Sequence, residues 1–335
     1  MNALWIALGI IAVLLGILVL SFCLSPLPAS RLMRALFKKP RISPPPHYAQ
    51  MEAAVRVVEN IPYPSQYGRN TLDIYFPTSA DGKRPVILWA HGGAYVAGDK
   101  TDIRYYATAL AAQGYAVVSM NYDLAPEARY PTPFVQVADV CQWIASAQEE
   151  YTLNPEKLIL AGDSAGAHIM AQYALIQTSP QYAALCDQQG LSGPKNICGL
   201  LLYCGPYQAA KIQDMKGIFG FMLGKAAWAY YGSPNWHGQY GEEISIVGHI
   251  TGDFPPAFIT DGNTTSFADH AQALAAMLRE KGVPADTFFI PAEEEKTFHE
   301  YQFIMDTPAG QECYRRTLAF LESHLGEAAG ETPVP

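Results

Sequence analysis

The feature that most constrains this chain is a tight turn between a strand and a helix. An apolar run at residues 157–161 reads as a buried strand, passes directly into Gly162-Asp163-Ser164-Ala165-Gly166 and is followed by a helical pattern. Small residues two positions either side of the serine permit so sharp a turn, because bulkier side chains would clash. The turn presents the hydroxyl of Ser164 at the top of a sheet, near the positive end of the following helix. Ser164 is therefore a candidate nucleophile.

Strand and helix patterns alternate over most of the remaining chain. Short apolar runs predict buried strands at residues 71–76, 85–90, 115–120, 157–161, 197–203, 256–260 and 287–290. Helical patterns occupy residues 103–113, 134–150, 165–177, 267–281 and 311–325. This alternation predicts an α/β fold with a mostly parallel central sheet covered by helices on both faces.

The N-terminal region predicts a membrane anchor. Residues 3–24 are apolar apart from Ser21 and two glycines, and as a helix they would extend about 33 Å, against a hydrocarbon core of about 30 Å. A cleaved signal peptide would have a basic start and a shorter apolar core. The bulky Phe22 before Cys23 also does not suit a lipoprotein cleavage site. We therefore expect a single transmembrane helix within residues 1–25.

Charge is distributed unevenly along the chain. Residues 1–30 carry no charged side chain, and five basic residues with no acid follow: Arg31, Arg34, Lys38, Lys39 and Arg41. Basic residues that flank a span tend to stay in the cytoplasm, so we expect the body of the protein on the cytoplasmic side. The same cluster could contact anionic headgroups. Residues 42–335 carry 17 basic residues against 31 acidic ones, which argues against a nucleic-acid partner.

The predicted organisation has three parts. After the anchor, residues 26–55 form a basic juxtamembrane segment and a proline-rich linker, and residues 56–335 form the main domain. Within that domain an aromatic-rich stretch at residues 207–254 separates two predicted strands. So long an insertion is typical of a cap or lid over a site. An alternative is that part of it dips into the bilayer interface.

A second candidate feature follows the predicted strand at residues 85–90. It is the sequence His91-Gly92-Gly93-Ala94-Tyr95. Paired glycines let backbone N–H groups face a developing oxyanion without obstruction from side chains. We expect the N–H groups of Gly92 and Gly93, with that of Ala165, to form an oxyanion hole.

Three ordered motifs carry a family resemblance: HGGAY, then NYDLAPEARYPTP at residues 121–133, then GDSAGAH. Together they resemble the hormone-sensitive-lipase-like branch of the α/β-hydrolases. The resemblance implies hydrolysis of carboxylic esters with short to medium acyl chains through an acyl-enzyme, with no cofactor or metal and a small-molecule or lipid-like ester as substrate. The chain departs from the branch at Ala94, Asp123 and Ala167, which bears on substrate preference.

The general base is predicted to be His299. In this fold the chain order is nucleophile, acid, histidine. Of the eight histidines, His299 alone lies in a loop just after the last predicted strand, within Lys296-Thr297-Phe298-His299-Glu300-Tyr301. There it would accept the proton of Ser164 and return it to the leaving group.

The acid is less clearly indicated, because Thr265 stands where the branch has its aspartate. Asp261 is our first choice, since it sits at the carboxyl end of the strand at residues 256–260, where ligand-facing residues of open α/β sheets concentrate. Asp269 is the second choice, although the spacing from Ser266 fits a capping box at a helix start. A Ser–His dyad supported by Thr265 and Asn263 is the third possibility.

Other functions use similar residues. Amide or formamide hydrolysis and acyl transfer run on the same machinery, and a non-catalytic binding protein could retain the fold. The Thr265 substitution favours the last alternative. The joint presence of Ser164, His299 and the paired glycines favours an enzyme.

Overall fold

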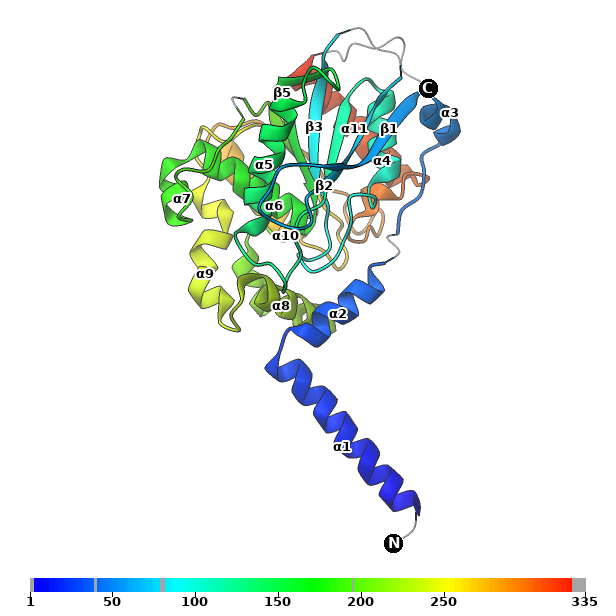
Figure 1. Ribbon diagram of the computed structural model, residues 1–335, viewed down its shortest axis with the longest axis vertical. Helices are drawn as coiled ribbons and strands as arrows, with labels where there is room; N and C mark the ends of the chain where they lie inside the picture. Colours follow the sequence, from blue (N-terminus) through cyan, green and yellow to red (C-terminus); the bar gives the residue numbers. More distant parts are fainter. Residues whose placement is uncertain (1–2, 39–40, 79–81, 195, 327–335) are drawn as a thin grey trace.

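A single twisted sheet forms the centre of the molecule (Figure 1). The computed structural model describes residues 3–38, 41–78, 82–194 and 196–326. The eight strands are ordered β1-β2-β4-β3-β5-β6-β7-β8; β1 pairs with β2 and β2 with β4 antiparallel, and the other pairs are parallel. The strands are β1 Val55–Pro62, β2 Thr71–Pro77, β3 Arg84–Ala90, β4 Ala116–Met120, β5 Leu153–Asp163, β6 Gly199–Tyr203, β7 Ala257–Thr260 and β8 Ala285–Phe288.

Helices cover both faces of this sheet, as the strand–helix alternation predicted. Along the fully buried strand β3, Val86 and Leu88 face one apolar cluster while Ile87 and Trp89 face the other. The first cluster includes residues of α5 Thr132–Ser146, α6 Ala165–Thr178 and α10 Ala268–Glu280, and the second includes residues of α4 Arg104–Ala112 and α11 Pro308–Leu325. The short helices α3 Tyr48–Ala53 and α7 Pro180–Leu185 complete this part of the structure. The predicted fold class is confirmed.

The insertion at residues 207–254 is helical. It contains the short 3₁₀ helices Ala209–Asp214 and Ile246–His249 and the helices α8 Gly217–Tyr231 and α9 Trp236–Ile244. Tyr230 of α8 stacks on Tyr95 with ring centroids 4.1 Å apart. Because Tyr95 belongs to the glycine loop after β3, this contact holds the insertion against the edge where the candidate site residues lie.

The N-terminal residues form two helices, α1 Ala3–Leu24 and α2 Leu27–Leu36. Among the described residues, α1 is the one helix long and apolar enough to cross a membrane. It projects from the body, whereas α2 lies beside α8 (Figure 1). Arg34 of α2 donates to the carbonyl oxygens of Val96 and Ala125, both at 2.7 Å, and pairs with Glu127. Helix α2 is therefore packed on the body of the protein through Arg34 and its contact with α8.

Candidate active site

Ser164 lies at the turn between β5 and α6, with φ 51° and ψ −117°. The crossing of two backbone segments forces this turn. A Cβ added to Gly162 would collide with the backbone of Gly166, and one added to Gly166 would collide with the carbonyl of Ala90. The glycines are thus required by packing, and the strained turn points the serine hydroxyl into a pocket.

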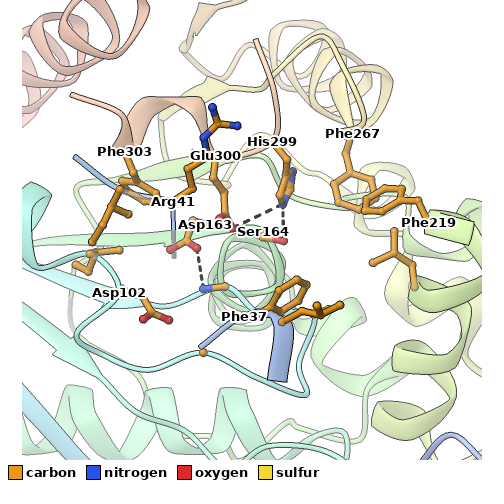
Figure 2. Close-up of a pocket in the computed structure, with 18 residues that line it drawn as sticks. Phe37, Arg41, Asp102, Asp163, Ser164, Phe219, Phe267, His299, Glu300 and Phe303 are labelled. Carbon is orange, nitrogen blue, oxygen red and sulfur yellow. Dashed lines mark hydrogen bonds and ion pairs between the residues drawn. The ribbon is translucent and has the colours of Figure 1, made fainter. Parts of the chain in front are cut away.

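His299 faces Ser164 across this pocket (Figure 2). Its Nε2 lies 2.9 Å from the Oγ of Ser164. The loop that carries it is tied to the loop after β7, because the amide of Asn263 donates to the carbonyl of Glu295 at 2.7 Å and the N–H of Thr264 donates to the carbonyl of Thr297 at 2.9 Å. Burial lowers the pKa of His299 to about 4. The ring is therefore neutral at neutral pH, as a general base must be.

Ser266 connects His299 to Asp261. Its Oγ lies 2.7 Å from Nδ1 of His299, and its hydroxyl donates to Oδ1 of Asp261. An ionised carboxylate only accepts, so the hydroxyl proton points to Asp261 and its oxygen accepts from Nδ1–H of His299. This arrangement leaves Nε2 unprotonated and directed at Ser164. The structure thus places a serine between base and acid, a residue that the sequence prediction missed.

Asp261 is buried, with 2% of its surface exposed. Burial raises the pKa of this carboxyl to about 7. Asp269, the second choice, lies in the first turn of α10 with 77% of its side chain exposed and does not reach His299. The expected capping box is also wrong, because Phe267 is the N-cap residue of α10 and Ser266 is engaged by Asp261 and His299. Asn263 binds backbone groups of the histidine loop instead of supporting a dyad.

In the glycine loop after β3, one of the predicted oxyanion-hole donors differs from the expectation. The N–H of Gly92 donates to Oδ2 of Asp163 at 2.8 Å, so it is already engaged. Within the part of the chain that the structure describes, the N–H groups of Gly93, Ala94 and Ala165 have no hydrogen-bond partner. Positive φ values of 111° at Gly93 and 52° at Ala94 turn the backbone of this loop. The available donors are therefore those of Gly93, Ala94 and Ala165.

Asp163 and Glu300 form a carboxyl pair beside the nucleophile. Asp163 also accepts from the indole of Trp89 at 2.8 Å, and one oxygen of Glu300 lies 3.6 Å from Nε2 of His299. Burial raises the pKa of Asp163 to about 6, although its hydrogen bond with Glu300 opposes this rise. Burial, together with the charge of Asp163 and the hydrogen bond to it, raises the pKa of Glu300 well above its ordinary value. The pair therefore retains a proton into the neutral range.

We expect Glu300→Gln to raise the Tm relative to the wild type, and to raise it more at high pH than at low pH. Raised pKa values mean that the folded state binds more protons than the unfolded state above about pH 4, so wild-type stability falls as the pH rises. The substitution removes one of these groups while keeping the side-chain shape. Thermal unfolding at pH 5 and pH 8 measures the effect. If the Tm of the variant differs from that of the wild type by the same amount at pH 5 and at pH 8, the prediction is wrong.

The pocket at Ser164 has a volume of about 280 Å³. Its walls are largely apolar and come from distant segments; they include Leu36, Phe37, Phe219, Leu223, Phe267 and Phe303. Figure 2 shows the four phenylalanines around Ser164 and His299. A smaller cavity of about 20 Å³ adjoins Ser164 on the side of Ala94 and Ala165. The site thus has a wide apolar side and a narrow one.

Cys204, Asp261 and His299 are also close enough to offer three metal ligands, with their ligand atoms within 4.8 Å of one another. Burial raises the pKa of the Cys204 thiol well above its ordinary value, and the hydroxyl of Ser266 already bonds both other groups. The donor set therefore suits a hydrogen-bonded proton relay better than a cation, which would require the thiolate.

A mostly parallel sheet with a strained serine after its fifth strand and a histidine from the loop beyond the eighth defines the α/β-hydrolase class. More narrowly, the chain belongs to the BD-FAE family, whose model matches residues 72–279.

The chain is similar to proteins named as esterases. An acetyl esterase of Salmonella schwarzengrund is 26% identical over 257 residues, which cover 70% of this chain and 72% of the relative. LipM of Mycobacterium tuberculosis, a probable carboxylic ester hydrolase, is 25% identical over 275 residues, 81% of this chain and 62% of that protein. Esterase B of Lactobacillus rhamnosis shares the fold, with a TM-score of 0.73 and 22% identity over 88% of this chain and 91% of its own. The chain is a carboxylic ester hydrolase of the hormone-sensitive-lipase-like branch.

Proposed function

We propose that the protein is a membrane-anchored serine esterase that works through an acyl-enzyme on Ser164. The observation that carries this proposal is the 2.9 Å contact between Ser164 Oγ and Nε2 of a neutral His299. Nε2 accepts the hydroxyl proton while Oγ attacks the acyl carbon, and the same nitrogen then returns the proton to the departing alkoxide. Water, activated by His299 in the same way, releases the acid.

The tetrahedral oxyanion is held by three backbone donors. The N–H groups of Gly93, Ala94 and Ala165 are free of partners within the described chain. Gly93 lines the wide pocket, Ala165 lines the small cavity, and Ala94 lines both. Gly92 has a different role, since its bond to Asp163 fixes the loop that carries these donors. Backbone donors placed in advance strengthen their bonds as charge develops on the oxygen.

The acid acts on His299 through Ser266. As His299 gains a proton at Nε2, its Nδ1–H bond to Ser266 strengthens, and the hydroxyl of Ser266 donates more strongly to Asp261. The negative charge of Asp261 is thus transmitted to the imidazolium over one additional hydrogen bond.

We further propose that α1 anchors the protein and that the body lies in the cytoplasm. The length and apolar character of α1 support the anchor, and the basic residues that follow it support the orientation. Because α2 packs on α8 and residues near its end line the pocket, we place the boundary of the catalytic unit before α2 instead of at residue 56.

Labelling of the wild-type enzyme tests the mechanism. A fluorophosphonate should form one adduct, on Ser164, and hydrolysis of p-nitrophenyl acetate should fall in proportion to labelling. Mass spectrometry of the peptide that contains Ser164 identifies the site. Inactivation with the adduct on another residue, or full labelling with full activity, would reject the proposal.

A further inference from the structure

Most of the exposed large apolar side chains on the body come from three segments. Outside α1, the described residues include seven such side chains. Val57 lies on the edge strand β1. The other six belong to α2 and the residue after it, to α8, and to the loop of His299: Leu32, Leu36, Phe37, Ile218, Phe221 and Phe298. Exposed apolar groups gathered in this way mark an interaction surface.

These six residues, which we call the apolar rim, belong to the three segments that also supply Leu36, Phe37, Phe219, Leu223 and His299 to the lining of the 280 Å³ pocket. Leu36 and Phe37 line the pocket themselves. On α8, the lining residues Phe219 and Leu223 are close in sequence to the exposed Ile218 and Phe221. Phe298 immediately precedes His299. The interaction surface and the entrance to the active site are therefore the same part of the molecule.

The apolar rim also adjoins the end of the proposed membrane helix. Only two residues separate α1 from α2, and the ammonium of Lys225 on α8 donates to the carbonyl of Cys23 in the last turn of α1 at 3.2 Å. Figure 1 shows α1 leaving the body next to α2 and α8. A helix that spans the bilayer would thus bring the apolar rim to the membrane surface.

The charges around the apolar rim suit that position. Arg31 and Lys38 flank the rim residues of α2, and Lys216 precedes α8; all three side chains are exposed. Apolar side chains with neighbouring lysine and arginine are typical of surfaces that lie in the headgroup region of a membrane.

The two sides of the site accept different parts of an ester. The leaving alkoxide takes its proton from His299, which lines the wide pocket and not the small cavity. The alcohol part must therefore lie in the wide pocket that opens at the apolar rim. The acyl group lies on the side of Ala94 and Ala165, where a cavity of about 20 Å³ leaves room for a short chain.

We propose that the enzyme takes its substrate from the bilayer in which it is anchored, and that this substrate is a short-chain ester of an apolar lipid alcohol. The alcohol part passes from the membrane over the apolar rim into the wide pocket, and the short acyl group reaches Ser164 first. This inference rests on the proposed function, since it assigns a substrate class to the same site.

Two acetate esters test the proposal with the full chain in phosphatidylcholine vesicles. One is water-soluble p-nitrophenyl acetate, and the other is an acetylglycerol whose remaining hydroxyls carry hexadecyl ethers, which stays in the bilayer. Ile218→Glu combined with Phe221→Glu should lower hydrolysis of the lipid acetate about tenfold or more, because charges on the apolar rim oppose contact with lipid. Hydrolysis of the soluble ester should change less than about twofold, since neither side chain lines the pocket.

Val57→Glu is the matched control. Val57 is 39% exposed, close to the 45% of Phe221, but lies on the edge strand β1, which supplies no residue to the pocket lining. It should leave both rates unchanged, and all variants should float with the vesicles because they retain α1. Equal hydrolysis of the lipid acetate by the rim variant and this control would overturn the proposal, as would a wild-type enzyme that cleaves only the soluble ester. If wild type cleaves neither ester, the proposed function itself fails.

The rim variant could lose hydrolysis of both esters because it fails to fold. A measurement on the wild-type enzyme tests the proposal in that case. At a fixed total amount of lipid acetate, ester-free vesicle lipid is added to dilute the ester within enzyme-containing bilayers. The rate should fall in proportion to the mole fraction of ester. A rate that follows only the bulk concentration would show that substrate arrives from water and would reject the proposal.

Discussion

Replacing Ser164 with alanine is expected to lower kcat for p-nitrophenyl acetate by about 10⁵-fold or more. The substitution removes the hydroxyl oxygen that lies 2.9 Å from the unprotonated nitrogen of His299. His299→Ala should cost a similar factor, because an unassisted serine hydroxyl is a weak nucleophile. The double variant should be no slower than either single variant, since the two groups act as one unit. Steady-state kinetics with purified proteins measures all three.

Substrate binding should survive in these variants. The pocket walls and the backbone donors at Gly93, Ala94 and Ala165 remain, so residual activity above the uncatalysed rate is expected. His237→Ala, in the cap and away from the pocket, serves as the control and should retain wild-type activity. A Ser164→Ala enzyme with more than about 1% of wild-type kcat would mean that another nucleophile operates.

Local rules of the chain made the nucleophile and base predictable. The turn at Ser164 is enforced by two glycines whose neighbours are backbone atoms, and glycine spacing is visible in a sequence. His299 could be selected by its position after the last strand. Buried parallel strands such as β3 also appear as continuous apolar runs. The edge strand β1 was missed because it is largely half-buried or exposed and carries no such run.

Other parts of the site depend on contacts between distant segments. Gly92 was predicted as an oxyanion donor, but the side chain of Asp163 takes its N–H across two strand ends. Leu36 and Phe37 were assigned to the basic juxtamembrane segment, outside the catalytic domain, although the packing of α2 on α8 makes them pocket walls. Ser266 was read as part of a helix cap because its local spacing fits one. Its actual bonds require the loop after β7 and the loop of His299 to meet.

The second large effect on kcat is expected when Asp261, the acid of the site, is replaced. Asp261→Asn should lower kcat by about 10³–10⁴-fold, because an amide cannot stabilise the imidazolium by charge and can reverse the hydrogen bond to Ser266. Ser266→Ala should cost about 10²-fold, since it cuts the connection while leaving Asp261 charged and nearby. Ser266→Thr keeps the hydroxyl and should retain activity to within about tenfold. If Ser266→Ala and Ser266→Thr behave alike, Ser266 does not connect the two groups.

The pH profile separates this positioning role from a structural one. Activity requires ionised Asp261, and burial raises its pKa to about 7, so wild-type kcat/KM should rise with pH through the neutral range. His299 titrates near pH 4 and contributes at the acidic end of the profile. The observed values belong to the coupled Asp261–Ser266–His299 unit. In Asp261→Asn the neutral limb should vanish, leaving a low rate that changes little between pH 6 and 8.

Stability should move in the opposite direction to activity. The carboxyl of Asp261 has an ordinary pKa of 3.8 and a folded-state pKa of about 7. The folded state therefore holds a proton that the unfolded state has released, and wild-type stability falls as the pH rises from about 4 to about 7. Asn stays neutral, so the Tm of Asp261→Asn should exceed that of the wild type by a margin that grows over this interval and is constant above it. A variant that is less active and less stable at pH 8 would instead mean that Asp261 is held ionised by interactions outweighing its burial.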